Sequence, residues 1–129
     1  MKKILLLCIM MIFVTGCTKV NPEEAANHIL KDQENGVSVI VFTSKPWEDS
    51  YRESLQKNID YINNNLKKDE PILHVSFINV EQDERYDYKT LFELKTDPQI
   101  LLFENDEIKL RTNDPDELVP YYENESIGK

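Results

Sequence analysis

The sequence predicts an α/β fold with four strands, two of them parallel and two forming an antiparallel hairpin. Two runs rich in β-branched and other apolar residues, 37–43 and 72–80, flank a stretch, 47–66, whose apolar residues recur at helical spacing. Because a long helix separates these two strands, we expect them to be parallel, with a right-handed crossover. Two further strands, 97–103 and 108–112, are separated by a tight turn and are expected to be antiparallel.

Capping residues mark the start of the first helix. Asn21 is placed to be the N-cap, Pro22 takes the first helical position, and Glu23 and Glu24 lie in the first turn, where the helix dipole favours carboxylates. The pair Asn35-Gly36 is a typical stop signal after a helix. The run 37–43 that follows is almost entirely apolar, which predicts a strand buried on both faces.

Three more helices are expected after the first strand. The longest has its apolar residues at spacings of three and four and closes near Asn64-Asn65; they are Trp47, Tyr51, Leu55, Ile59, Ile62 and Leu66. A short helix is expected over 88–94. The last helix starts at Asp114-Pro115, and Pro120 is expected to keep it from being long and regular, with a frayed polar tail after Tyr122.

The charge of the chain excludes one class of partner. There are 24 acidic and 15 basic residues, which gives a net charge of −9, and removal of Lys2 and Lys3 with a leader would give −11. Nucleic acid binding depends on clustered basic residues, so we expect no nucleic acid partner. The same surface does not favour lying flat on anionic lipid.

The N-terminus resembles that of a bacterial lipoprotein. Lys2 and Lys3 precede an apolar run, 4–14, that is shorter than the about 20 residues of a transmembrane helix. A plain signal peptide or an uncleaved anchor is the alternative interpretation. The ending Val14-Thr15-Gly16-Cys17 resembles a lipobox, which implies cleavage before Cys17 and acylation of its thiol, palmitate being a typical acyl group. Two acyl chains would hold the protein firmly on the extracytoplasmic face of the cell membrane.

This interpretation divides the chain into four parts. Residues 1–16 form the signal peptide, 17–21 the lipidated N-terminus and tether, 22–125 the folded domain, and 126–129 a polar tail. The two cysteines are Cys8, inside the signal, and Cys17, at the lipidation site. The processed domain would therefore have no free thiol and no disulfide, and would depend on its apolar core for stability.

Two local blocks resemble thioredoxins. The strand ending Phe77-Ile78-Asn79-Val80-Glu81-Gln82-Asp83 is similar to a thioredoxin strand, and the segment 97–108 is similar, without a gap, to the proline-strand-turn-strand block of that family. The resemblance implies a thioredoxin-like three-layer α/β/α sandwich with a four-stranded mixed sheet, which lacks the first edge strand of the family.

The resemblance also locates the active-site loop. Aligned without gaps, the Cys-x-x-Cys motif of thioredoxins falls on Trp47, Glu48, Asp49 and Ser50; if Trp47 matches the tryptophan before the motif, Glu48 and Tyr51 take the cysteine positions. Neither alignment leaves a thiol to be activated at the helix N-terminus. Glu48 and Asp49 are also ordinary residues at the start of a helix.

Pro98 resembles the cis-proline of the family, which faces the active-site loop and leaves the preceding backbone free to pair with an extended peptide. A trans proline at the first position of a strand is the alternative. Asp97 stands where the family has an aliphatic residue or threonine. Trp47 either begins the buried face of the long helix or lies in the loop beside Pro98 as an aromatic anchor for a ligand.

No metal site or cofactor is expected. His28 and His74 are not spaced like zinc ligands, and the acidic segments 81–87 and 104–107 lack the spacing of a calcium loop. We expect a redox-inactive, monomeric accessory lipoprotein that binds an extracytoplasmic protein or peptide. The alternatives are a relative of thiol-disulfide oxidoreductases that acts with the cysteines of a partner, and an immunity-type scaffold lipoprotein.

Overall fold

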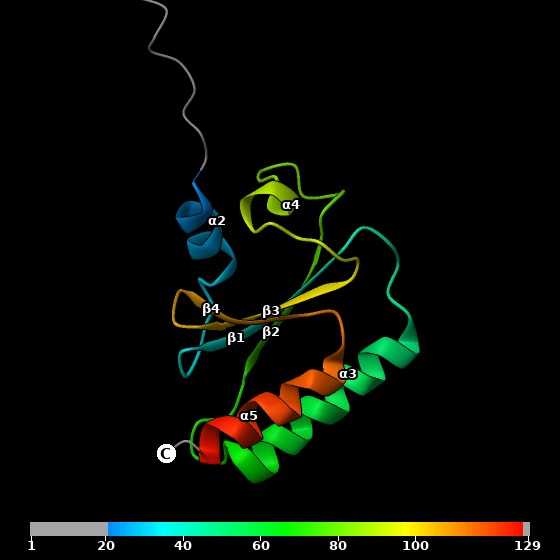
Figure 1. Ribbon diagram of the computed structural model, residues 1–129. Coiled ribbons are helices and arrows are strands. Elements are labelled where there is room, and N and C mark those ends of the chain that lie inside the picture. Colours follow the sequence, from blue (N-terminus) through cyan, green and yellow to red (C-terminus); the bar gives the residue numbers. More distant parts are fainter. Residues whose placement is uncertain (1–20, 128–129) are drawn as a thin grey trace, which may run out of the picture.

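The computed structural model describes residues 21–127, so Cys17 and the expected signal segment lie outside the described residues. The elements in chain order are α2 (Pro22–Ile29), β1 (Val37–Thr43), α3 (Asp49–Tyr61) with a π-helical extension (Ile62–Leu66), β2 (His74–Asn79), α4 (Tyr88–Leu91), β3 (Gln99–Glu104), β4 (Glu107–Thr112), a 3₁₀ turn (Pro115–Glu117) and α5 (Leu118–Ile127). Figure 1 shows α2 and α4 on one side of the sheet and α3 and α5 on the other. The described part of the chain is therefore a three-layer sandwich.

The sheet has the expected mixed topology. Its strand order is β2-β1-β3-β4. β1 and β2 are parallel, with Val39 opposite Val75, whereas β1 and β3 are antiparallel, with Val39 opposite Leu102. β3 and β4 form the predicted antiparallel hairpin, with a register shift between Leu102 and Phe103. The parallel pairing of β1 with β2 and the hairpin, both predicted from the sequence, are thus confirmed.

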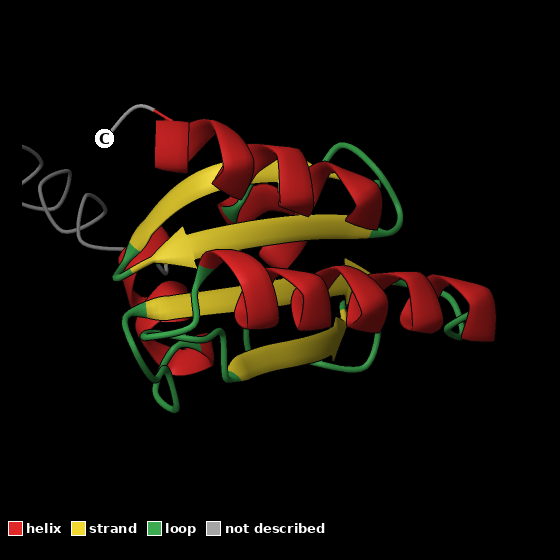
Figure 2. Cartoon of the chain, turned by 90° about the horizontal axis from the view of Figure 1, so that it is seen from below, coloured by secondary structure: helices red, strands yellow, loops and turns green. Residues whose placement is uncertain are grey.

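The central strand β1 divides the core into two clusters. All of its residues are buried, as predicted for a strand covered on both faces. Val39 and Val41 face the helices α3 and α5, and Ile40 and Phe42 face α2 and α4. Figure 2, which views the molecule from below, shows α3 and α5 lying across their face of the sheet. β1 therefore contributes to the apolar contacts with both layers of helices.

Several helix boundaries differ from the prediction. The long helix begins at Asp49 with Glu48 as its N-cap, so Trp47 lies just outside it, and its last turn is π-helical. The short helix ends at Leu91. The last helix continues to Ile127, so the predicted frayed tail is wrong within the described residues. Pro120 is tolerated because it lies in the first turn of α5, where a missing backbone N–H costs least.

The start of α2 agrees with the prediction, whereas its end does not. The side chain of Asn21 caps α2 by accepting hydrogen bonds from the backbone N–H groups of Glu23, at 2.6 Å, and Glu24, at 3.2 Å. The predicted end of this helix near Asn35-Gly36 is wrong, because α2 ends at Ile29 and Gly36, with a φ of +69°, lies in the turn before β1. No helix within residues 21–127 has the length and apolar character needed to cross a bilayer.

Candidate functional site

The candidate site lies where the end of β1 meets the start of α3. The loop between these elements runs beside Pro98, and the peptide bond between Asp97 and Pro98 is cis. Together they enclose a pocket of about 190 Å³, lined by Thr43, Lys45, Pro46, Trp47, Glu48, Tyr51, Asp97 and Pro98. β1 and β3 are antiparallel neighbours, so the end of β1 lies beside the start of β3. The loop that leads to α3 and the proline that precedes β3 therefore face each other.

The structure brings together some of the predicted site residues and separates others. Trp47 and Glu48 of the predicted loop share this pocket with Asp97 and Pro98. Asp49 and Ser50 instead form the first turn of α3, are exposed and do not line the pocket. They are ordinary residues at the start of a helix, as the alternative interpretation of Asp49 held.

Trp47 combines the two interpretations that the sequence left open. Its side chain is half-buried and packs against the core cluster on the α3 side of the sheet. Its ring makes an edge-on contact with Phe77, with 4.8 Å between ring centroids. Because the same side chain also lines the pocket, one face of the indole is anchored while another is available to a ligand.

The side chain of Asp97 connects the segment before β3 to the end of β1 and the loop that follows it. Its carboxylate accepts hydrogen bonds from the Thr43 hydroxyl, at 2.7 Å, from the Ser44 backbone N–H, at 3.1 Å, and from the Ser44 hydroxyl. Desolvation acts to raise the pKa of Asp97, but the hydrogen bonds from Ser44 and Thr43, with a smaller contribution from the charge of Lys45, outweigh it, so the pKa lies below the usual value. The carboxylate is therefore ionised at neutral pH and holds the loop in place.

The backbone of Asp97 has a different role from its side chain. Its N–H and C=O take no part in the backbone hydrogen bonds of residues 21–127, because the ladder with β1 begins only at Gln99. These groups flank the pocket at the point where Pro98 interrupts regular pairing. An extended peptide laid along this segment would find one donor and one acceptor.

Tyr51 lines the pocket, but its hydroxyl is buried away from solvent. It lines the pocket one helical turn after Trp47, and its buried hydroxyl has no hydrogen-bond partner within the described residues. Burial, and then the nearby charge of Asp114, raise the pKa of Tyr51 to about 12. The hydroxyl therefore stays protonated at neutral pH. The sequence identified Tyr51 only as a member of the helix's apolar face.

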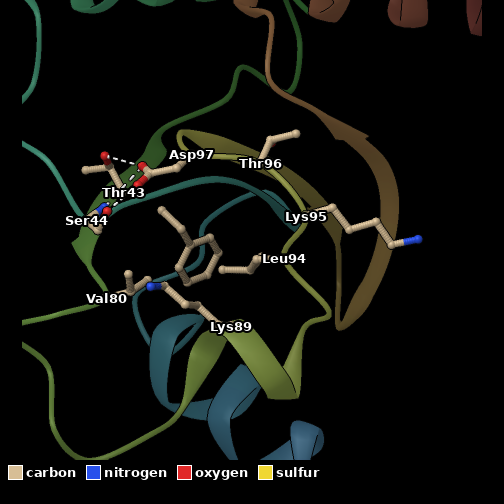
Figure 3. A pocket seen from close by; sticks show the side chains of 9 residues that line it. Thr43, Ser44, Val80, Lys89, Leu94, Lys95, Thr96 and Asp97 are labelled. Atoms are coloured by element: carbon tan, nitrogen blue, oxygen red, sulfur yellow. Dashed lines mark hydrogen bonds between the residues drawn. The ribbon is translucent and has the colours of Figure 1, made fainter.

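A second cavity lies on the other side of Asp97. It has a volume of about 230 Å³ and is lined by Phe42, Thr43, Ser44, Val80, Lys89, Leu94, Lys95, Thr96 and Asp97. Figure 3 shows the Asp97 carboxylate turned toward Thr43 and Ser44, and the Lys95 side chain pointing away from the cavity. Thr43 and Asp97 line both cavities, so they form part of the wall between them. Nothing in the sequence identified Thr43 or Ser44 as a site residue.

No protein-family model and no curated protein matches the chain. Solved structures do match it. Thioredoxin f2 of Chlamydomonas reinhardtii superposes with a TM-score of 0.51 at 11% identity, over 85% of this chain and 96% of that one. The chain has a thioredoxin-like fold. The predicted fold class is thus confirmed, with β1 and β2 parallel and the other neighbouring strands antiparallel.

Two further structures share the thioredoxin-like fold. A cysteine-to-serine mutant of a thioredoxin from Entamoeba histolytica has a TM-score of 0.50 at 18% identity, over 78% of this chain and 91% of that one. Zinc-bound human ERp44 has a TM-score of 0.51 at 16% identity, over 78% of this chain and 30% of that one. At such identities the similarity concerns the fold alone.

Proposed function

We propose that this protein is a membrane-anchored, extracytoplasmic lipoprotein that uses a redox-inactive thioredoxin-like domain to bind an extended segment of another protein. Acylation of Cys17 would provide the anchor. The pocket between Trp47 and Pro98 would provide the binding site. The observation that carries the binding proposal is this pocket, in which an aromatic wall lies beside backbone groups of Asp97 that have no partner in the described fold.

Two features of the pocket suit a peptide better than a small polar molecule. The half-buried indole of Trp47 offers an apolar contact that is already fixed by Phe77, so little side-chain entropy is lost on binding. The backbone of Asp97 offers main-chain hydrogen bonds, which recognise any extended peptide.

Redox chemistry by the chain alone is not part of the proposal. Residues 18–129 contain no cysteine, and the helix start that would activate a thiol carries Glu48 and Asp49. We expect the purified protein to show no insulin reduction with dithiothreitol above the uncatalysed rate. Measurable turnover would overturn the redox-inactive proposal and favour the oxidoreductase alternative.

The test of the binding proposal is a crosslinked pull-down from membranes with single-residue variants. We expect Trp47→Ala to abolish capture of the partner that the wild type retains, and Pro98→Ala to weaken it. Tyr61→Ala is the control, because Tyr61 is a more exposed aromatic residue at the far end of α3 and does not line the pocket. If both pocket variants capture the partner as the wild type does, the contacts lie elsewhere on the acidic surface, and the scaffold alternative is favoured.

A further inference from the structure

The two edges of the sheet are protected to different degrees. β4 forms one edge, and its exposed positions carry the charged residues Glu107, Lys109 and Arg111. Its pairing with β3 also contains a register shift. Charges and irregular pairing are the usual means by which a protein prevents another strand from adding to an edge. β4 is therefore closed to further pairing.

β2 forms the other edge and has none of these protections. Within residues 21–127 it pairs with β1 alone. The stretch 72–80 contains no charged residue and no proline, although 30% of the chain is charged. Two large apolar side chains are exposed along it, Leu73 at 57% and Phe77 at 40%. An uncharged, regular and partly apolar edge of this kind is suited to accept another strand.

We propose that β2 is covered by β2 of a second copy of this chain, in antiparallel pairing, so that the sheets of two copies form one continuous sheet. The twofold axis passes through Val75, which places Phe77 of each copy opposite Leu73 of the other. Each exposed apolar side chain then covers its counterpart across the junction. This inference differs from the monomer expected from the sequence, and it does not depend on the proposed function.

Charge complementarity favours a second copy as the occupant. The stretch 72–80 has no charge to repel its own copy, although just outside it the register places Asp69 of one copy opposite Glu81 of the other. The side of α3 that lies next to β2 carries charges of both signs. The Arg52 guanidinium lies over the Phe77 ring, 5.7 Å from its centroid. Gln56 lies one helical turn after Arg52 and donates a hydrogen bond to Asp60, which is exposed and lies one further turn along the helix.

The direction of α3 brings these charges together across the junction. The helix starts above Phe77 and ends beside Ile72, where Asn63 makes hydrogen bonds of 2.7 and 2.9 Å to the backbone of Ile72. α3 thus runs opposite to β2. A twofold axis at the middle of β2 therefore places Arg52 of one copy at the same end as Asp60 of the other.

Disulfide crosslinking of the full-length chain in whole bacteria tests this arrangement wherever the protein is located. Residues directly opposite each other in an antiparallel pair have Cβ atoms about 5 Å apart, close enough to form a disulfide. We expect Val75→Cys to give, on mild oxidation, a reducible species of twice the chain's mass. Ser76→Cys is the matched control, because in this register residue 76 faces His74 of the other copy. The wild type, with Cys8 and Cys17, gives the background.

Each other result overturns the proposal. Crosslinking of Val75→Cys no stronger than the wild-type background excludes the pairing, provided that circular dichroism shows the variant to be folded. Crosslinking that is stronger for Ser76→Cys excludes the register. A species that contains a different protein assigns the edge to another occupant.

A charge exchange provides a second test that leaves the strand unchanged. Arg52→Asp and Asp60→Arg should each reduce the crosslinked fraction of Val75→Cys, and the double exchange should restore it. Equal crosslinking in all these backgrounds would show that the two residues do not meet, and would overturn the placement of the twofold axis.

Discussion

Asp97 shows how one residue can couple two functions of a site. Its side chain faces the loop after β1 and accepts hydrogen bonds from Thr43 and Ser44, whereas its backbone flanks the pocket at Pro98. A carboxylate can accept several hydrogen bonds at once, which an aliphatic residue or threonine at this position cannot. The carboxylate at this position therefore connects the loop after β1 to the segment that contains Pro98.

We predict that Asp97→Asn destabilises the protein by about 1 kcal/mol at pH 7, less than is usual for hydrogen bonds to a charged group because the residue is exposed. The pKa of Asp97 is lowered by folding, so its contribution is full above the ordinary value of 3.8 and is lost as the pH falls through the lowered pKa of the folded state. Urea unfolding of both proteins at pH 7 and at pH 3 and below measures this difference.

The control for Asp97→Asn is Asp69→Asn, which removes an exposed carboxylate without a hydrogen bond in residues 21–127. It should leave the stability nearly unchanged at every pH. A difference between wild type and Asp97→Asn that stays constant down to the acid range would contradict the role given to the charge of Asp97.

At the scale of elements, helix ends decide which residues reach the site. α3 begins at Asp49 rather than at Trp47. Trp47 therefore lies in the loop, where it contacts both Phe77 and the pocket. α2 shows the same dependence on its first residues, because the cap formed by Asn21 fixes where Ala25, Ala26 and Ile29 enter the core.

We predict that Asn21→Ala destabilises the protein by about 1 kcal/mol, the usual cost of losing an N-cap side chain. The two backbone N–H groups that Asn21 caps would be left to solvent. Asn27→Ala is the matched control, because Asn27 is exposed within the same helix and caps nothing. Thermal unfolding followed by circular dichroism compares the variants, and equal losses of stability would contradict the capping role.

At the scale of the whole molecule, the protein combines a small apolar core on each face of the sheet with a strongly acidic composition. The clusters on the two faces of β1 are built largely from aliphatic and aromatic residues. Only two ion pairs with contacts of 4 Å or less occur within residues 21–127, both exposed at the surface. Such pairs contribute little, so apolar burial is the main source of stability. The proposed anchor at Cys17 would keep the domain near the membrane. Its acidic surface would prevent it from lying flat on anionic lipid.

We predict that Cys17→Ser releases the protein from the membrane fraction, because the thiol is the proposed site of acylation. Labelling of growing bacteria with an alkyne analogue of palmitate should mark the wild type and leave this variant unmarked. Cys8→Ser is the matched control, since Cys8 lies within the proposed signal peptide. If Cys17→Ser is labelled and sediments like the wild type, the anchor is of another kind.

The order of the elements, the parallel crossover, the hairpin and the double-sided burial of β1 were all predictable from the sequence. Each depends on a local pattern: the spacing of apolar residues, a run of β-branched residues, or a proline beside a cap. The resemblance of segment 97–108 to thioredoxins likewise located Pro98. These are properties of neighbouring residues, which the chain carries before it folds.

The tertiary structure alone decided which side chains meet. The hydrogen bonds from Thr43 and Ser44 to Asp97, the contact of Trp47 with Phe77 and the open edge at β2 all join or expose residues that are distant in the sequence. Such contacts depend on strand order and helix direction, which a local pattern does not contain. The sequence by itself thus determined the fold class and the absence of a thiol in residues 18–129, and packing around β1 determined the shape of the site.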